Sequence, residues 1–487
     1  MSPHPSDRID ARRAIVDIGS NSLRLVIYAG PSRVRGILYN EKVPVGLGRN
    51  LAATGAIGAD AFAAGVAACR RFVAVLAAAG VANVTTVATA AARDAADGPE
   101  FLKAVRAAGL KPQLLAGTEE AIASAMGVRS AFPGANGIAG DIGGGSLELV
   151  ELRDGQLERP ASFPLGTLRL PALRGKGGKL DAKAIRKMLK DGGWPAATGP
   201  IDYYSVGGTG RALAALDLHL LGARVPLVHG HAIPASRLRL LREAIAMRDL
   251  GELRRIPGIA SARVPMLDDL AALFEVLADH LGITRFVISG FGLREGLLFQ
   301  ALDPAVQALD PLIDGARAWQ TRQGRPGWDG ETVASWIAPL FAGETAGEAA
   351  IRTATCLVSG GGLEEESEAR AEHALDVALL GPWVGLDARG RELLAQALYT
   401  AWGGKGRPEA LSENYPLAIR WGEAIRMAER LGGNHSAPLS RGSLSLTGKN
   451  VILTLRHDDE ALYGDIVRKQ HRTLAATFGG DAVLELA

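Results

Sequence analysis

The feature that most constrains the fold of this chain is a short pattern that occurs twice. Residues 16–28 read VDIGSNSLRLVIY, and residues 140–152 read GDIGGGSLELVEL. Each copy places Asp-Ile-Gly, two small residues and Ser between hydrophobic runs, which is typical of a strand, a tight turn and a returning strand. A pattern repeated at such a distance predicts two similar domains, each built around one of these hairpins.

Strand and helix patterns alternate around both copies. A long alanine-rich helix at residues 60–79, for example, is followed by a buried strand at residues 84–89, and such alternation predicts an α/β fold. A chain of 487 residues is also too long for a single core. We therefore predict two α/β domains, at residues 1–130 and 131–305.

The pattern changes after the second of these domains. Long helical patterns with few strand signals predict a helical domain at residues 306–438. Short alternation followed by one helix then predicts a small α+β domain at residues 439–487.

Composition excludes several classes of protein. A formal net charge of +2 gives no basis for non-specific binding of nucleic acid. Two cysteines are too few for a disulfide framework and favour a reducing compartment. The longest uncharged stretch, residues 72–92, contains a glycine and several polar residues, so it predicts a helix end, a turn and a strand rather than a membrane span. We predict a cytoplasmic protein that binds neither nucleic acid nor membrane.

The residues of the repeated turn are suited to binding phosphate. Each first strand ends in a carboxylate, Asp17 or Asp141. Glycine lets the backbone N–H groups of the following turn approach an anion closely, because it has no Cβ. A carboxylate beside a phosphate is repulsive unless a cation lies between them, which predicts Mg²⁺. An ordinary glycine hairpin is the alternative for one copy alone, but two matching copies favour phosphate binding. The predicted phosphate-binding residues of the turns are Ser20, Asn21, Ser22, Gly143, Gly144, Gly145 and Ser146.

These motifs resemble the exopolyphosphatase and guanosine pentaphosphate phosphatase (Ppx/GppA) family, within the acetate and sugar kinase, heat-shock protein and actin superfamily. The resemblance covers about residues 12–305, in the family's order. The matching segments are DIGSNS at 17–22, TAAARDA at 89–95, GTEEA at 117–121, DIGGGSLE at 141–148, FPLG at 163–166 and VGGT at 206–209. The resemblance implies two actin-like (ribonuclease H-like) domains that flank a cleft.

The resemblance also implies roles for individual residues. The first glutamate of the Glu-Glu pair, Glu119, would be the general base that activates water, although a carboxylate in a first helical turn is also stabilised there by the helix dipole. Arg93 would contact phosphate and stabilise developing charge. The implied metal ligands are Asp17, Asp141 and Glu148. Gly207, Gly208 and Thr209, at a strand-to-helix turn that the family also shows, predict a further anion site, with a simple capping turn as the alternative.

The helical region resembles a metal-dependent phosphohydrolase-like domain. His373 fits that domain's first histidine, but the chain reads LYTAW at 398–402 where the His-Asp metal pair is expected. We therefore predict that this domain lacks a metal site. Separately, the family resemblance implies that the protein is a homodimer.

Taken together, the sequence predicts an exopolyphosphatase that removes terminal orthophosphate from inorganic polyphosphate with Mg²⁺. The alternatives are a guanosine pentaphosphate 5'-phosphatase in the same cleft, an ATP-dependent small-molecule kinase and a non-catalytic phosphate sensor. The prediction requires Asp17 and Asp141 to lie on opposite walls of one crevice, with Glu119 reaching into it.

Overall fold

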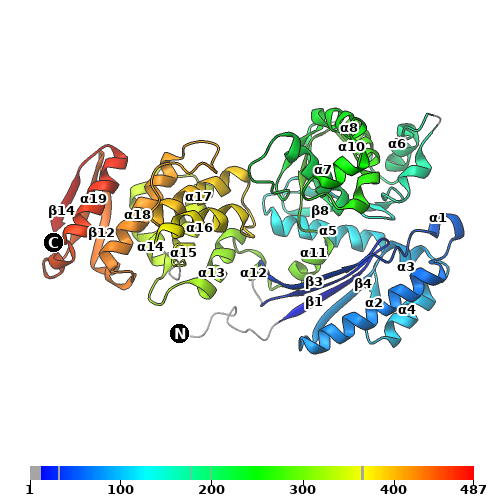
Figure 1. The fold of residues 1–487 in the computed structure, drawn as a ribbon, viewed down its shortest axis with the longest axis horizontal. Helices are drawn as coiled ribbons and strands as arrows, with labels where there is room; N and C mark the ends of the chain where they lie inside the picture. Colours follow the sequence, from blue (N-terminus) through cyan, green and yellow to red (C-terminus); the bar gives the residue numbers. More distant parts are fainter. Residues whose placement is uncertain (1–11, 31–32, 176, 198, 363–366) are drawn as a thin grey trace. The chain divides into compact units, whose positions relative to one another are not determined.

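The computed structural model of the chain describes residues 12–30, 33–175, 177–197, 199–362 and 367–487 (Figure 1). It divides into two compact units, Met1–Ala308 and Leu309–Ala487. The finer boundaries predicted at 130/131 and 438/439 lie inside these units and stay predictions.

The first sheet has five strands in the order β3-β2-β1-β4-β5. The first three are antiparallel neighbours, whereas β4 and β5 run parallel to β1. Strands β1 and β2 lie inside the sheet and are covered on both faces. Both strands are therefore apolar along nearly their whole length. The strands are β1 Arg13–Ile18, β2 Leu23–Tyr28, β3 Ile37–Val43, β4 Asn83–Ala88 and β5 Pro112–Leu114.

The second sheet repeats this topology, in the order β10-β11-β9-β6-β7-β8. Starting from β8, three antiparallel strands are again followed by two parallel ones, and β10 adds an antiparallel edge. The prediction of an α/β fold repeated around the two hairpins is confirmed. The strands are β6 Gly137–Ile142, β7 Leu147–Arg153, β8 Gln156–Phe163, β9 Ile201–Val206, β10 Ala232–Pro234 and β11 Ile283–Ile288.

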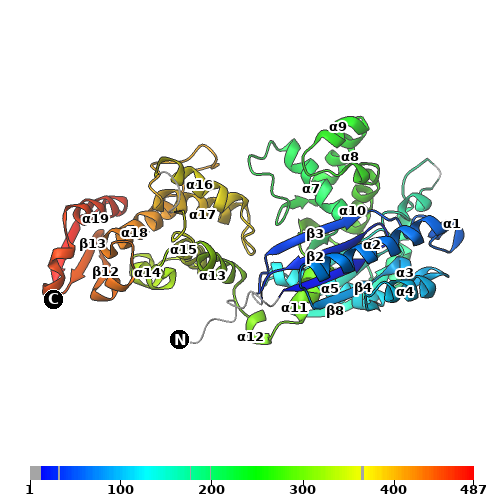
Figure 2. The same cartoon turned by 60° about the horizontal axis from the view of Figure 1, so that its bottom comes forward.

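Helices cover both sheets of this unit (Figures 1 and 2). Helices α2 (Ala59–Ala78) and α4 (Gly98–Ala107) pack on one face of the first sheet through Phe72 and Phe101. By length and composition, α2 could cross a membrane; here its buried face contacts the sheet. The unit's other helices are α1 Leu51–Thr54, α3 Ala90–Asp94, α5 Gly117–Ala131, α6 Ala182–Asp191, α7 Gly208–Leu220, α8 Leu238–Ala246, α9 Leu250–Arg255, α10 Leu267–Leu281, α11 Leu293–Gln300 and α12 Pro304–Gln307.

Helices α5 and α11 cross at very close range. A Cβ added to Gly296 would lie 1.7 Å from the carbonyl oxygen of Ala123, and one added to Gly127 would lie 2.2 Å from that of Gly292. Only glycine fits at such contacts, since a side chain would overlap backbone atoms. Both helices also contact the buried residues of the first sheet, and α5 contacts those of the second. The crossing therefore fixes the start of α11 against the middle of α5, and both helices carry residues of the cleft described below.

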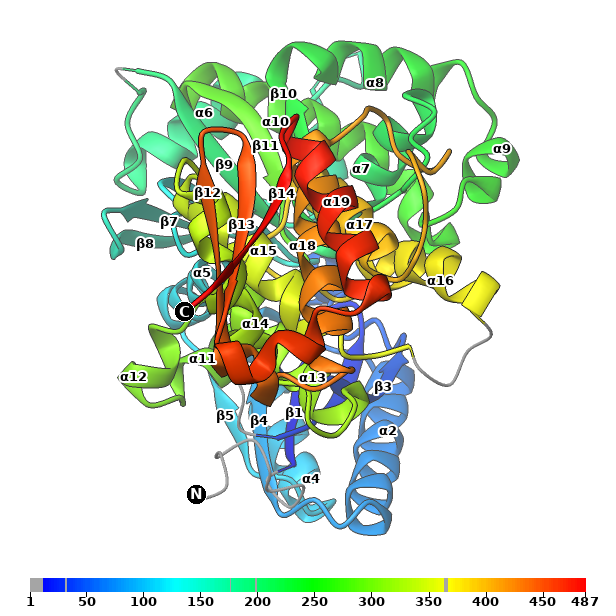
Figure 3. The same cartoon turned by 90° about the vertical axis from the view of Figure 1, so that its left-hand side faces the viewer.

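The second unit is helical and ends in a small three-stranded sheet (Figure 3). Helix α19 is tied to β13 by a hydrogen bond between His471 Nε2 and the Val451 carbonyl, 3.0 Å apart. His373 stacks on Trp402 with the ring planes 2° apart. The elements are α13 Pro311–Gln323, α14 Gly330–Ile337, α15 Ala346–Val358, α16 Ser367–Leu380, α17 Ala388–Ala401, α18 Pro416–Gly432, β12 Gly442–Thr447, β13 Asn450–Leu455, α19 Asp465–Phe478 and β14 Ala482–Leu486.

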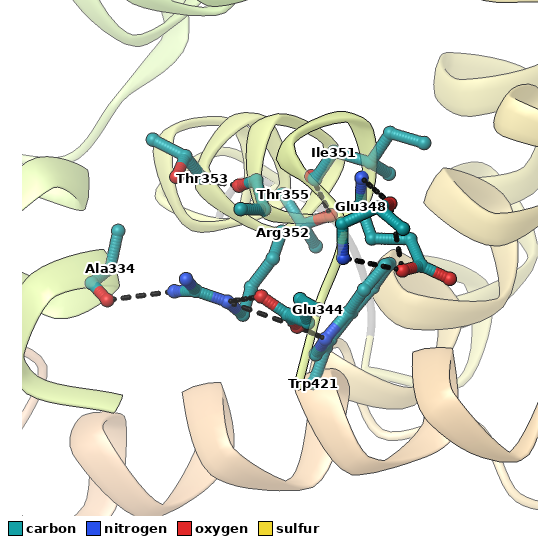
Figure 4. A network of polar contacts seen from close by, with 10 residues as sticks. Ala334, Glu344, Glu348, Ile351, Arg352, Thr353, Thr355 and Trp421 are labelled. Atoms are coloured by element: carbon teal, nitrogen blue, oxygen red, sulfur yellow. Dashed lines mark hydrogen bonds and ion pairs between the residues drawn. The ribbon is translucent and has the colours of Figure 1, made fainter. Parts of the chain in front are cut away.

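A buried ion pair connects the helices of this unit (Figure 4). The Arg352 guanidinium donates through Nε to Glu344, 2.9 Å away, and through Nη1 to the Ala334 carbonyl, 2.8 Å away. Trp421 donates its indole N–H to the same Glu344 carboxylate. The charged side chains are 8% and 5% exposed, so their charges depend on these partners.

Candidate active site

The two repeated turns line one cleft in the first unit. We call residues 19–22 the first turn and residues 143–146 the second turn. All four residues of each turn line the cleft, and so do Asp17 and Asp141, the last polar residues before them. The two carboxylates therefore line one cleft, as the prediction requires, and their placement on opposite walls stays a prediction.

Each turn is held in the same way. Gly19 N donates to Ser22 O (3.2 Å), and Gly143 N donates to Ser146 O (3.0 Å). The carbonyls of the first turn then accept hydrogen bonds from Gly46 and Gly48, and those of the second accept from Thr167 and Leu168. Because each of these supporting loops follows the third strand of its sheet, the repeat extends beyond the hairpin itself.

The two turns approach each other through Ser20. A Cβ on Gly145 would lie 3.1 Å from Ser20 Oγ, and one on Gly144 would lie 3.4 Å from Ser20 Cβ. None of the three glycines of the second turn has a positive φ. Their lack of a side chain therefore serves close approach rather than an unusual backbone conformation.

The carboxylates Asp141 and Glu148 lie directly opposite each other on β6 and β7. Asp141 Oδ2 accepts from Ser124 Oγ (2.6 Å), and Glu148 Oε1 accepts from Ser162 Oγ (2.8 Å). Burial, together with the charge of Asp141, raises the pKa of Glu148 to about 8, and burial also raises the pKa of Asp141. Glu148 is 2% exposed and is not among the residues that line the cleft. Like charges placed opposite one another are costly, which points to a functional role for the pair.

We expect Glu148→Gln to stabilise the metal-free protein at alkaline pH. Because folding raises the pKa of this carboxyl from 4.5 to about 8, the wild type loses stability as pH rises through that interval. Glutamine keeps an acceptor for Ser162 and cannot ionise. Urea unfolding with a chelator present should show an advantage for the variant that grows across this window, to roughly 5 kcal/mol. A difference that stays constant from pH 5 to pH 9 would contradict this.

Of the adjacent glutamates on α5, Glu120 lines the cleft and Glu119 does not. Glu119 is exposed, and its Oε2 accepts the backbone N–H of Ala116 (2.8 Å), which caps the helix. Burial and the charges of Glu148 and Asp141 raise the pKa of Glu120 well above its ordinary value. The prediction that Glu119 reaches into the cleft is therefore wrong; Glu120 occupies that place.

Arg93 lies beside Glu120. Its Nη1 is 3.5 Å from Glu120 Oε2 and donates to the Leu115 carbonyl at 3.1 Å. The same Glu120 oxygen has no hydrogen-bond partner among the described residues. Arg93 itself does not line the cleft, so the structure places it against the carboxylate rather than in the space where phosphate would lie.

The predicted anion site at the start of α7 is only partly in the cleft. Gly207 and Gly208 line it, whereas Thr209 is fully buried and its Oγ1 accepts from Arg263 Nη1 at 2.7 Å. Gly207 has φ 114°, and a Cβ there would lie 2.7 Å from the Ile142 carbonyl oxygen, so glycine is required. Thr209 thus holds an arginine of the cleft instead of facing a ligand directly.

Five cationic side chains that the sequence analysis did not single out line the same cleft. They are Arg24, Lys42, Arg211, Arg263 and Arg294. Burial, followed by the charges of Arg294 and Arg211, lowers the pKa of Arg24 to about 10. Burial also lowers the pKa of Lys42, and Arg263 and Arg24 add to the effect. Cations gathered so closely destabilise one another, and an anion between them would relieve that repulsion.

For some of these cations, the sequence contains a pattern that could have predicted their place in the cleft. Arg211 follows directly after a glycine-rich strand-to-helix turn and Arg294 follows another by two residues, and anions bind readily at such turns. Arg24 takes in the first hairpin the position that Glu148 takes in the second, and it pairs across the sheet with Lys42. Arg263 comes from a long connection and has no such signal.

The comparisons with known proteins agree with this architecture. The profile of the Ppx/GppA phosphatase family matches residues 11–305, more than half of the chain. Exopolyphosphatase 1 of Mycobacterium leprae is 27% identical over 307 residues, which cover 60% of this chain and 90% of that protein. Retrograde regulation protein 2 of Saccharomyces cerevisiae is 25% identical over 444 residues, 80% of this chain and 72% of that protein.

Solved structures share the actin-like fold of the first unit. The crystal structure of an exopolyphosphatase from Cytophaga hutchinsonii matches with a TM-score of 0.52 at 20% identity, covering 61% of this chain and 99% of that one. The Aquifex aeolicus member of the Ppx/GppA family matches with a TM-score of 0.50 at 24% identity, covering 59% and 96%. With its two repeated domains, its shared cleft and the family profile that spans both, this chain belongs to the Ppx/GppA phosphatase family.

Proposed function

We propose that this phosphatase is an exopolyphosphatase, which hydrolyses the terminal phosphoanhydride bond of inorganic polyphosphate. The observation that carries the proposal is the cleft itself, which is lined by two glycine-containing turns, five cations and a largely buried carboxylate, Glu120. Such a site matches a chain of phosphates, which offers negative charge at every unit and few apolar groups. The exopolyphosphatases among its relatives support the same substrate class.

Glu120 would act as the general base. It would accept a proton from a water molecule whose oxygen attacks the terminal phosphorus, while the bond to the bridging oxygen breaks and the shortened chain leaves. A base with a raised pKa transfers protons effectively near neutral pH. Arg93, 3.5 Å from the Glu120 carboxylate, would orient that group, and the cations would stabilise charge on the phosphate oxygens.

The donor set of the cleft fits Mg²⁺ held together with substrate. No group of three or more His, Cys, Asp or Glu side chains that could hold a metal occurs in the described part of the chain. Mg²⁺, however, is usually bound by one or two carboxylates, with waters and substrate phosphates completing its shell. Burial raises the pKa of Asp17, and the charge of Asp141 raises it further, so a cation between these carboxylates would be favourable. We propose that Asp17 and Asp141 hold Mg²⁺, which would neutralise phosphate charge.

Guanosine pentaphosphate remains the second candidate, because the same base and cations would serve its terminal phosphate. It would also require a surface for the purine, and the residues that line the cleft include no aromatic side chain. This observation favours polyphosphate.

Phosphate release separates the candidates. We expect purified protein to release orthophosphate from long-chain polyphosphate faster than from guanosine pentaphosphate, and to lose that activity when a chelator removes Mg²⁺. Faster release from the guanosine compound would assign the second candidate. ATP-dependent phosphorylation of a small acid or sugar, without phosphate release from either compound, would assign a kinase. Binding of polyphosphate without any release would assign a sensor.

A further inference from the structure

An ion-pair chain crosses between the two domains of the first unit, next to the proposed base. Asp94, the last residue of α3, accepts from Arg93 Nε at its Oδ1 (3.3 Å) and from Arg169 Nη2 at its Oδ2 (2.8 Å). Arg93 in turn lies 3.5 Å from Glu120. Arg169 belongs to the second domain, whereas the other three residues precede β6. The order of contacts is thus Arg169, Asp94, Arg93, Glu120.

Arg169 also belongs to the loop that supports the second turn. In that loop Thr167 N donates to Gly143 O (3.0 Å), and Leu168 N donates to Gly144 O (2.9 Å). A Cβ on Gly166 would lie 2.3 Å from the backbone of the second turn. The loop and the turn are therefore in direct backbone contact, with no room for a side chain between them. The position of Arg169 is therefore tied to the position of the turn that would hold phosphate.

We propose that Arg169 and Asp94 are positioning residues that align Arg93, and through it Glu120, with phosphate held in the second turn. The inference rests on the proposed function and extends it to two residues that do not line the cleft. Neither residue contacts the reacting atoms. Their effect is to give Arg93 one orientation, since Asp94 occupies its Nε while its Nη1 lies against Glu120.

We call the Arg169–Asp94 ion pair the bridge. Its solvent exposure separates a positioning role from a purely structural one. Arg169 and Asp94 are 31% and 33% exposed, and ion pairs at such positions contribute little to stability. Removing the bridge should therefore leave the melting temperature nearly unchanged, while a small displacement of a catalytic group can cost a large factor in rate.

The experiment is a double-mutant cycle on steady-state phosphate release from polyphosphate. Asp94→Asn and Arg169→Gln should each lower kcat about 10-fold, with KM within about twofold of the wild type. Because both act through one bridge, the double variant should be no slower than the slower single variant. Arg169→Lys, which keeps the charge, should recover part of the loss. Single variants at wild-type kcat, multiplicative losses in the double variant, or a loss confined to KM would overturn the proposal.

Arg242→Gln is the matched control. Arg242 is 30% exposed and pairs with Asp268 and Glu275 within the second domain, so its removal breaks ion pairs of comparable exposure and should leave kcat unchanged. A fall in kcat for this control equal to that of Arg169→Gln would also overturn the proposal.

A second readout does not depend on turnover. Spin labels at Glu100→Cys on α4 and Lys183→Cys on α6 report the separation of the domains, since both positions are exposed and the native cysteines are buried. Asp94→Asn should broaden that distance distribution, and an unchanged distribution would count against the bridge. If the wild type releases no phosphate from any substrate, the proposed function fails, and the bridge is judged by this distance alone.

Discussion

Replacing Glu120 by glutamine should lower kcat for phosphate release about 10²–10⁴-fold. Glutamine has nearly the same size but cannot take a proton from water. The fold should tolerate the change, because the carboxylate is costly where it stands: burial and the charges of Glu148 and Asp141 raise its pKa. The unfolding free energy of Glu120→Gln near neutral pH should therefore equal or exceed that of the wild type, which unfolding in urea would measure alongside the kinetics.

Its neighbour provides the control. Glu119 is exposed and accepts the N–H of Ala116 at the start of α5, so Glu119→Gln should cost at most about 1 kcal/mol of stability and leave kcat near that of the wild type. If Glu119→Gln abolished phosphate release while Glu120→Gln retained it, the assignment of the base from the structure would be wrong, and the assignment implied by the family resemblance would stand.

The error over these two glutamates has a definite physical origin. The family resemblance assigned the first glutamate of the pair, whereas in the structure Glu119 accepts the Ala116 N–H at the start of α5 and Glu120 lines the cleft. Adjacent residues on a helix point about 100° apart, so the two glutamates cannot both face the same cleft. Sequence identifies helix ends to within a few residues, which is not enough to decide which of two adjacent side chains faces a cleft.

The hairpins and their common cleft were predictable, because an Asp-Ile-Gly turn between apolar runs is a local signal and its repetition implies similar folding. The cation cluster was not. Arg24 and Lys42 become partners only when the register of β2 and β3 is known, and Arg263 reaches the site from a connection with no periodic pattern. The crossing of α5 and α11 at Gly127 and Gly296 likewise depends on tertiary packing.

In the second unit, Arg352→Met should lower the free energy of unfolding by about 3–5 kcal/mol. Arg352 and Glu344 are 8% and 5% exposed, and the arginine also donates to the Ala334 carbonyl. Without it, the Glu344 charge would remain buried with the Trp421 indole N–H as its remaining donor among the contacts in Figure 4. Tryptophan fluorescence in urea is a suitable measurement, because Trp194 is the one tryptophan of the seven that lies outside this unit.

Two further variants separate loss of the ion pair from loss of packing. Arg352→Met combined with Glu344→Leu removes both charges and keeps similar apolar volume, so it should recover most of the stability. Thr353→Ala on the same helix removes a hydroxyl that donates to the Ala349 carbonyl within α15 and should change stability by no more than about 0.5 kcal/mol. If the double variant were as unstable as Arg352→Met alone, the stability of this helix cluster would depend on the shape of the arginine. The unpaired Glu344 carboxylate would then not be the cause of the lower unfolding free energy.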